Sequence, residues 1–413
     1  MPAGIRSRER ENAMFASFTS LLRRMKLKNG FCARIPVMVL VFGLAFIGCD
    51  NGDPQAGSTV YIAGVYDDGY TKTPCYWKNG ARTDLPIPAG TDSAWNFFLA
   101  VSPNGDVHIT GAYVSGSYRN DDYTSTRCYW KNGVRTDLPA PDGTESGAGD
   151  IAIAPNGDVY IAGAYGSGSY RNDDYTSTAC YWKNGIRADL PVPDGTESSA
   201  YFIAIASNGD VYIAGYYESG SGYNSTWTAC SWKNGIMADL SVPDGIHYID
   251  IAGIAVSPNG DVYIAGDYES GSRDDNTYTS TLCYWKNGVR TDLPVPAGAV
   301  ERFIGFSEKS IAVAPNGAVY IIGGYSDDDG DTHTACYWKN GVRSDLPLPA
   351  GAESSTYNIA LAVSSNGDAY IAGSYSSGSQ DDGTFTSTAC YWKNGVRTDL
   401  GANSIPTSIA VLP

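Results

Sequence analysis

The sequence predicts an all-β fold, a seven-bladed β-propeller built from four-stranded antiparallel blades. Three observations predict it: a sevenfold repeat, two Asn-Gly turn signals in each repeat, and short Val/Ile/Tyr runs without sustained helical periodicity after residue 50. The repeat reads close to Cys-Tyr-Trp-Lys-Asn-Gly, and its Trp recurs at positions 77, 130, 182, 232, 285, 338 and 392. A spacing of about fifty residues is typical of architectures in which each repeat is one supersecondary unit.

Each repeat divides into four expected strands. In the third repeat these are 151–154, 159–163, 179–182 and 186–190. Asn-Gly stands between the first two strands and again between the last two. Both residues tolerate the positive φ of a type I′ turn, so we expect two tight hairpins in each blade.

The ends of the array predict closure into a ring. The array begins at 59–62 with a second strand that lacks its first, and it ends at 409–412 with a first strand that lacks its second. The C-terminal strand can therefore complete blade 1 and cover the open edges. The expected propeller spans residues 59–413.

The N-terminus is typical of a targeting segment. An apolar run from Ile35 to Ile47 follows several basic residues, and it has the length of a signal-peptide core. Gly48-Cys49 resembles the lipobox of bacterial lipoproteins, so we expect a signal peptide over 1–48, with Met25 as an alternative start, lipidation at Cys49 and a tether over 49–58. The expected product is an exported, membrane-anchored lipoprotein of the bacterial cell envelope, periplasmic or surface-exposed. Simple secretion and an uncleaved anchor are the alternatives.

Charge excludes one large class of partner. The whole chain carries a net charge of -16 and its first 48 residues carry +6, so the remainder carries -22. Such a surface repels phosphate backbones and anionic headgroups. We expect no nucleic-acid partner, a monomer, and membrane contact through the lipid anchor only.

The residues that repeat in every blade are expected to be scaffold. Seven equivalent cysteines in an exported protein raise the possibility of disulfides. Blades stack at about 10 Å, beyond the roughly 7 Å between Cα atoms that a disulfide permits, so buried free thiols are expected. The repeated Asp residues are expected to satisfy local backbone groups or pair with nearby Arg; they stand at 84, 137, 189, 239, 292, 345 and 399.

Two segments carry a family resemblance. Residues 254–266, Ile-Ala-Val-Ser-Pro-Asn-Gly-Asp-Val-Tyr-Ile-Ala-Gly, resemble bacterial SBBP and NHL-type propeller repeats. Residues 389–400, Ala-Cys-Tyr-Trp-Lys-Asn-Gly-Val-Arg-Thr-Asp-Leu, are similar to the extracellular HAF repeat. The resemblance implies an extracytoplasmic propeller that is typically without an assigned activity.

The variable loops lie at the end of each blade opposite the Asn-Gly turns, and insertions on one face often mark a binding face. These loops and the channel mouth are rich in Asp and aromatic residues, and the candidate binding face comprises Asp67, Tyr70, Trp95, Asp121, Tyr123, Asp173, Tyr175, Tyr248, Asp274, Asp327, Tyr357 and Asp381. Either these are solvated turn residues, or they dock a protein or glycan at the cell surface. No cofactor is expected apart from calcium, for which Asp327, Asp329 and Asp331 offer alternating oxygens without the acidic twelfth residue of an EF-hand loop.

The main expectation is therefore a binding or adhesion scaffold that is not an enzyme. The sequence contains neither a nucleophile elbow nor an HExxH motif, and its three histidines are scattered over different blades. His108 replaces a repeated Tyr and is expected to pack. The alternative is an enzyme acting on polysaccharide, with Asp250 and Glu308 at the channel mouth as the carboxylate pair.

Overall fold

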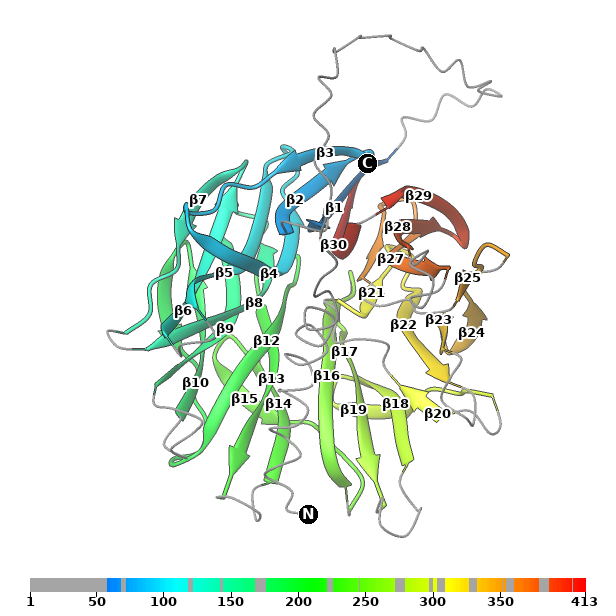
Figure 1. Ribbon diagram of the computed structural model, residues 1–413. Coiled ribbons are helices and arrows are strands. Elements are labelled where there is room, and N and C mark those ends of the chain that lie inside the picture. Colours follow the sequence, from blue (N-terminus) through cyan, green and yellow to red (C-terminus); the bar gives the residue numbers. More distant parts are fainter. Residues whose placement is uncertain are drawn as a thin grey trace. The chain divides into compact units, whose positions relative to one another are not determined.

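A computed structural model describes the propeller, in which seven antiparallel sheets are arranged as blades around a common axis (Figure 1). It describes residues 58–67, 72–117, 122–141, 144–167, 176–220, 226–244, 246–271, 279–296, 300–302, 309–326, 333–350, 352–353, 360–378, 386–402 and 404–413. The predicted all-β, seven-bladed fold is confirmed. The expected signal peptide, Cys49 and nearly all of the tether lie outside the described residues.

The first four blades each contain four strands, numbered here from the inner strand outward. Blade 1 combines β30 (Ser404–Leu412) with β1 (Thr59–Asp67), β2 (Lys72–Lys78) and β3 (Ala81–Asp84). Blade 2 contains β4 (Thr91–Val101), β5 (Val107–Ser117), β6 (Asp122–Lys131) and β7 (Val134–Asp137). Blade 3 contains β8 (Glu145–Ile153), β9 (Val159–Ser167), β10 (Thr176–Lys183) and β11 (Ile186–Asp189). Blade 4 contains β12 (Glu197–Ile205), β13 (Val211–Ser219), β14 (Thr226–Lys233) and β15 (Ile236–Asp239).

In two of the last three blades the inner strand is divided. Blade 5 contains β16 (Ile246–Val256), β17 (Val262–Ser270), β18 (Thr279–Lys286) and β19 (Val289–Asp292). Blade 6 contains β20 (Val300–Arg302) and β21 (Ile311–Val313) as inner segments, then β22 (Val319–Ser326), β23 (His333–Lys339) and β24 (Val342–Asp345). Blade 7 contains β25 (Ala352–Glu353) and β26 (Ala360–Val363), then β27 (Ala369–Ser377), β28 (Thr386–Lys393) and β29 (Val396–Ala402).

The C-terminal strand closes the ring as the sequence predicts. β30 pairs antiparallel with β1, with Thr59 opposite Leu412 and Ile62 opposite Ile409. The blue β1 and the red β30 lie side by side in Figure 1. Inner strands contact each other in the cyclic order β30, β4, β8, β12, β16, β21, β26 and back to β30. A single sheet therefore contains both ends of the array, and this removes the exposed edge of an open array.

The outer Asn-Gly turn has the predicted conformation. In blade 3, Asn184 and Gly185 have φ values of 50° and 81°. The Asn184 side chain also joins the two hairpins, since its Oδ1 accepts the N–H of Val159 at 2.9 Å and its Nδ2 donates to Asp158 at 2.8 Å. This contact places both Asn-Gly turns of a blade at one end, as predicted.

The inner Asn-Gly turn differs from the expected type I′ turn. Its Gly157 has a φ of 88°, whereas Asn156 is not among the described residues with positive φ. The N–H of Gly157 donates to the carbonyl of Ala154 at 2.8 Å. The prediction of two type I′ turns per blade is therefore wrong for the inner turn, because the N–H of Ala154 bonds to the carbonyl of Asp158 and closes a longer loop in which only Gly is left-handed.

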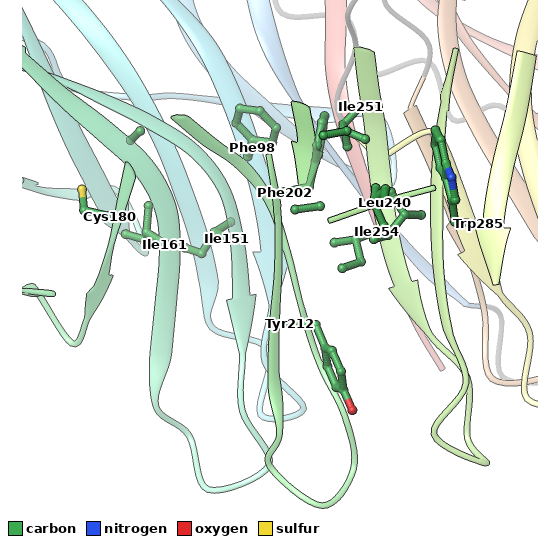
Figure 2. Packing of buried hydrophobic residues seen from close by; sticks show 14 of the residues in the cluster. Phe98, Ile151, Ile161, Cys180, Phe202, Tyr212, Leu240, Ile251, Ile254 and Trp285 are labelled. Carbon is green, nitrogen blue, oxygen red and sulfur yellow. The ribbon is translucent and has the colours of Figure 1, made fainter. Parts of the chain in front are cut away.

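Repeated apolar side chains form the core between blades. The repeated Trp residues of blades 2 to 7 have essentially no exposed surface, and the seven repeated cysteines are buried free thiols, as expected. In the largest cluster Cys180 lies in blade 3, Tyr212 and Leu240 in blade 4, and Ile254 and Trp285 in blade 5 (Figure 2). The core is thus a series of inter-blade layers, which is why the repeat carries large residues in every blade.

The repeated Trp also links neighbouring blades through a hydrogen bond. The indole N–H of Trp182 in blade 3 donates to the carbonyl of Pro139, just after the outer strand of blade 2, at 2.8 Å. The same bond recurs from blade 2 to blade 7, with lengths from 2.6 to 2.9 Å. Each blade therefore satisfies a backbone carbonyl of the blade before it.

The repeated Asp of the outer strand has the structural role that was predicted. In blade 3, Arg187 lies 3.1 Å from Asp189 and stacks on Tyr165, with the guanidinium carbon 4.4 Å from the ring centroid. The hydroxyl of Tyr165 donates to Asp189 at 3.2 Å. Blades 2, 5, 6 and 7 repeat all three contacts.

In the described part of the chain no helix is long and apolar enough to cross a membrane.

Candidate functional site

One row of side chains in blade 4 departs from the repeat near the loop-rich end, opposite the Asn-Gly turns. Glu197 on β12 lies directly opposite Glu218 on β13, and Glu218 lies directly opposite Trp227 on β14. Residues that face each other across antiparallel strands point to the same side of the sheet. The row therefore presents two carboxylates and an indole together.

Two tyrosines lie next to this row, further along β12 and β13 toward the Asn-Gly end of the blade. Tyr216 contacts Trp227 edge-on with ring centroids 4.3 Å apart, and Tyr201 lies 5.2 Å from Tyr216. The hydroxyls of Tyr201 and Tyr216 are hydrogen-bonded to each other. All five side chains are partly exposed. We call Glu197, Tyr201, Tyr216, Glu218 and Trp227 the blade 4 site.

The blade 4 site faces blade 5. Ala214 lies two residues before Tyr216 on the same side of β13, and it packs in the cluster that contains Ile249 and Ile251 of blade 5. Because alternate side chains of a strand point to the same side, Tyr216 and Glu218 lie on the same side of β13 as Ala214. They lie on the surface between blades 4 and 5, past the end of its buried core. The site is built on strands rather than loops, which gives its side chains a defined direction.

The two carboxylates are not equivalent. Burial raises the pKa of Glu197, and the nearby negative charge of Glu218 raises it further. Both effects disfavour the ionised form of Glu197. A raised pKa lets a carboxyl group keep its proton to higher pH, which favours general acid catalysis.

The other described blades contain parts of this row but not the combination: the position of Glu197 is also Glu in blades 3 and 7, as Glu145 and Glu353, and the position of Glu218 is Glu269 in blade 5, opposite Tyr248. The position of Trp227 is occupied by a serine that pairs with the neighbouring strand in blades 2, 3, 5 and 7: Ser125, Ser177, Ser280 and Ser387. The position of Glu218 is Val114, Gly166 and Ser376 in blades 2, 3 and 7. Since scaffold residues repeat, a row that occurs once is a candidate for function.

Blade 5 contains a second pair of facing carboxylates. Asp250 on β16 lies directly opposite Asp267 on β17. Asp250 accepts the N–H of Ile251 at 2.8 Å, and Asp267 accepts the hydroxyl of Ser280 at 3.3 Å. The sequence-based pairing joined Asp250 with Glu308, which lies outside the described residues. The structure gives Asp250 a different carboxylate neighbour in its own blade.

A third charged group lies among the inner strands. Asp150 on β8 has no exposed surface, and its carboxylate lies 2.9 Å from the ammonium of Lys309, which immediately precedes β21. Asp150 also accepts the N–H groups of Ile151 at 2.7 Å and Ile203 at 3.3 Å. This carboxylate is saturated by blades 3, 4 and 6, so it is structural.

The described members of the sequence-predicted binding face lie toward the loop-rich end but in different blades. Asp67 in blade 1 lies 3.5 Å from Lys72, Trp95 in blade 2 lies opposite Ala112, and Tyr248 in blade 5 lies opposite Glu269. Tyr123 on β6 lies opposite Gly116 on β5. The remaining predicted residues lie outside the described chain: Tyr70, Asp121, Asp173, Tyr175, Asp274, Asp327, Tyr357 and Asp381.

Metal binding finds no support in the described residues, which contain no group of three or more His, Cys, Asp or Glu side chains arranged to hold a metal ion. The predicted calcium ligands Asp327, Asp329 and Asp331 lie outside this part of the chain. His108 packs as expected, since it is buried and its Nδ1 lies 2.6 Å from the hydroxyl of Tyr129.

The sequence contained a signal for the blade 4 site that the prediction missed. Of nine tryptophans, seven belong to the repeat, and the other two are Trp95 and Trp227. The predicted binding face includes Trp95 but not Trp227. Trp227 stands three residues before the repeated Cys230, and Glu197 and Glu218 are too far apart in sequence to be recognised as a pair.

No known protein family matches the chain, and no curated protein matches it either. Among solved structures it is similar to an ulvan lyase of polysaccharide lyase family PL25 bound to -[GlcA(1-4)Rha3S]-, at 11% identity and a TM-score of 0.45, covering 84% of this chain and 91% of that one. It is similar to the α-L-arabinanase of Penicillium chrysogenum complexed with arabinobiose, at 14% identity and a TM-score of 0.42, covering 84% and 99%. It is also similar to the polysaccharide lyase Uly1, at 13% identity and a TM-score of 0.42, covering 82% and 88%.

These structures correct the expectation that the chain is not an enzyme. That expectation rested on the absence of catalytic motifs and on a resemblance to repeats without assigned activity, whereas the solved structures similar to this chain include two polysaccharide lyases and an arabinanase. At such low identity they carry no information about the substrate or the catalytic residues of this chain. Only the side chains of this chain itself can indicate its substrate and its catalytic residues.

Proposed function

We propose that the chain is an enzyme that hydrolyses glycosidic bonds of a polysaccharide at the blade 4 site. The observation that carries the proposal is the row of Glu197, Glu218 and Trp227, which places two unequal carboxylates beside an indole. Glycoside hydrolysis needs one carboxyl group that donates a proton and a second that is ionised.

The register defines the roles of the two carboxyl groups. Side chains directly opposite each other have Cβ atoms about 4.5–5.5 Å apart. Carboxyl groups about 5–5.5 Å apart are typical of glycosidases that retain anomeric configuration. In the proposed reaction, Glu197 protonates the leaving oxygen because its pKa is raised, and ionised Glu218 attacks the anomeric carbon to form a glycosyl-enzyme ester. Water then cleaves the ester while Glu197 accepts its proton, which regenerates both groups.

The aromatic side chains support binding of the sugar. Trp227, Tyr216 and Tyr201 are contiguous and partly exposed, and an indole face gives a sugar ring a large apolar surface at low entropic cost. The tyrosine hydroxyls add hydrogen-bond donors and acceptors to that surface. This combination of apolar faces with a few polar groups is common in ligand sites.

Export belongs to the proposal, because a polysaccharide substrate lies outside the cytoplasm. The motif at Gly48-Cys49 supports a lipid anchor at the cell envelope. Replacement of Cys49 by Ala should then release the protein from membranes, so that it partitions into the aqueous phase and not the detergent phase. Continued membrane association of that variant would contradict the anchor without bearing on the enzyme.

The experiment is a reducing-end assay of the purified chain on a panel of neutral and acidic polysaccharides. Glu197→Gln and Glu218→Gln should each lower the rate about 10²- to 10⁴-fold, the range for loss of an acid or base group. The matched control is Glu269→Gln, because Glu269 occupies the position of Glu218 in blade 5 and should leave the rate unchanged. Activity that survives both substitutions in blade 4, or polysaccharide binding without release of reducing ends, would overturn the proposal.

A further inference from the structure

Blade 6 breaks a repeated contact at the end of the propeller opposite the blade 4 site. In blades 2, 3, 4, 5 and 7 an Asp follows the inner Asn-Gly turn and forms an ion pair with the Lys of the repeat, at 2.8 to 3.2 Å. Blade 6 has Ala318 at this position, so the Asp that pairs with the repeated Lys in the other five blades is replaced. No salt bridge involves Lys339 in the described part of the chain.

The other donors to that Asp are also kept in blade 6. In the five complete blades the carboxylate accepts one Asn Nδ2 from the outer turn at 2.7 to 2.8 Å. It accepts a second Asn Nδ2 from the inner turn at 2.9 to 3.2 Å. Blade 6 retains both residues, Asn340 and Asn316, and their Oδ1 atoms still accept the N–H groups of Val319 at 2.9 Å and Ala318 at 3.0 Å. Both turns therefore keep their conformation, and three donors remain around a position that lacks its carboxylate.

A groove of about 250 Å³ lies between blades 6 and 7, and Lys339 is the member of the donor set that lines it. Tyr320 and Tyr337 line the blade 6 side with ring centroids 6.5 Å apart, and Asn366 and Gly367 line the blade 7 side. The volume is below the roughly 300–1,000 Å³ of pockets for drug-sized ligands, which fits a single sugar unit. Aromatic faces, amide groups and a backbone carbonyl are the groups that bind sugar rings and hydroxyls.

The charge of the groove favours an anion. Lys339 stays protonated, since its hydrogen bond to the hydroxyl of Tyr320 raises its pKa. Asp368 also lines the groove, but its carboxylate is neutralised by Lys393 at 3.0 Å and accepts the amide of Asn394 at 2.7 Å. In the sister blades, one ammonium and two amide groups bind an Asp carboxylate. The same three groups of blade 6, from Lys339, Asn340 and Asn316, are therefore preorganised to bind the carboxylate of a ligand.

We propose that blade 6 binds a carboxylated sugar, a uronic acid unit, at this position. The sugar carboxylate takes the place of the missing Asp and accepts bonds from Lys339, Asn340 and Asn316, while the ring lies in the groove against Tyr320 and Tyr337. The site is independent of the blade 4 site and does not require that the chain be an enzyme. Blade 1 has Thr59 at the equivalent position and has no inner Asn-Gly turn before it, so blade 6 alone keeps the full donor set.

The test is titration of the purified chain with D-glucuronate, followed by calorimetry or by NMR of an amide-labelled sample. Wild type should bind glucuronate at one site and should bind D-glucose and acetate at least tenfold more weakly. Ala318→Asp, which restores the carboxylate found in five sister blades, should fold normally and weaken glucuronate binding at least tenfold, as should Lys339→Met. Equal binding of glucose or acetate, or full binding by the Ala318→Asp variant, would overturn the proposal.

The converse substitution offers a positive control within the same molecule. Asp158→Ala in blade 3 leaves Lys183, Asn184 and Asn156 without their carboxylate, so added glucuronate should shift the side-chain amide NMR signals of Asn184 and Asn156 in this variant and not in wild type. An absence of such shifts would count against the donor set as the cause of carboxylate binding. Glu197→Gln should leave glucuronate binding intact, so failure of the proposed hydrolysis and failure of this site are distinguishable.

Discussion

The ammonium of Lys309 in blade 6 lies 2.9 Å from the carboxylate of Asp150 in blade 3, where Asp150 has no exposed surface. Lys309 also donates to the carbonyl of Ile151 at 3.1 Å, and its own backbone has a φ of 66°, in the left-handed region that non-glycine residues rarely adopt. Blades that are not neighbours in the ring are thus joined by a single side chain. The contact acts in addition to the layers that hold adjacent blades together.

Removing the cation should destabilise the propeller strongly. Lys309→Met leaves Asp150 buried without its counter-charge, and loss of one partner from a buried pair costs about 3–5 kcal/mol. Urea unfolding at pH 7 measures the change. The double variant Lys309→Met with Asp150→Asn should recover part of it, because the uncompensated charge is gone. A loss below about 1 kcal/mol in the single variant would contradict a structural role for the pair.

The same pair predicts a pH dependence. Burial raises the pKa of Asp150 more than Lys309 lowers it, so the folded state binds this proton more tightly than the unfolded state does. Stability from this residue is therefore full below the ordinary Asp pKa and declines as the pH rises through the raised value. Urea midpoints measured from pH 4 upward should show a smaller decline for Asp150→Asn than for wild type. Identical slopes would contradict the assignment.

Acid should weaken the propeller at the Asn-Gly end. Hydrogen bonds from Asn side chains and from the paired Lys lower the pKa of Asp106, Asp158, Asp210 and Asp261 to about 2. Their stabilisation is present above the ordinary Asp pKa and is lost as the pH falls toward 2. Asp158→Asn should be less stable than wild type at pH 6 and should lose less stability on acidification. Unfolding midpoints at pH 6 and pH 2.5 compare the two proteins.

The Trp hydrogen bond should contribute measurably to stability. Trp182→Phe keeps an aromatic ring in the core but leaves the carbonyl of Pro139 without its donor, so a loss of about 1–3 kcal/mol is expected. Trp227→Phe is the matched control, because Trp227 is partly exposed and should change the free energy of unfolding by less than about 0.5 kcal/mol. Equal losses in both variants would mean that ring size, not the hydrogen bond, sets the cost.

The proposed acid predicts the basic limb of the activity profile. Since the pKa of Glu197 is raised, kcat/KM should fall with increasing pH as Glu197 loses its proton. Glu218→Gln removes the charge that contributes to this shift, so the titration seen in any residual activity or by NMR of Glu197 should move to lower pH. If the basic limb stays at the same pH in that variant, the charge of Glu218 does not affect the pKa of Glu197, which would contradict the proposed pairing of the two carboxyl groups.

Much of the scaffold could be predicted because the residues that each blade needs for its turns and its core recur in all seven repeats of the sequence. The outer Asn-Gly turn needs two positive φ values, and the repeated Trp and Cys need a buried layer, so the same residues recur in each blade. The terminal half-blades at Thr59 and Leu412 likewise predicted closure. The inner turn was predicted wrongly because its loop is closed between Ala154 and Asp158 and is longer than a type I′ turn, although it contains the same Asn-Gly signal.

The candidate site was harder to predict, because it depends on register rather than on sequence proximity. Glu197 and Glu218 become partners only when β12 pairs with β13, and a bulge between Ala200 and Phe202 shifts that pairing. A one-residue slip would turn one carboxylate to the other face of the sheet. Asp150 and Lys309 are 159 residues apart, and no local pattern announces their contact.

The pairing of β1 with β30 also places the two ends of the propeller next to each other in one sheet. Thr59 and Leu412 are register partners, so a short linker from Pro413 to Ser58 would close the backbone within one sheet. New chain ends could then be opened at an outer Asn-Gly hairpin of any blade, with the same strands and neighbours retained. Such circular permutants would move the terminal half-blades around the ring and show whether closure at blade 1 has any role beyond joining the ends.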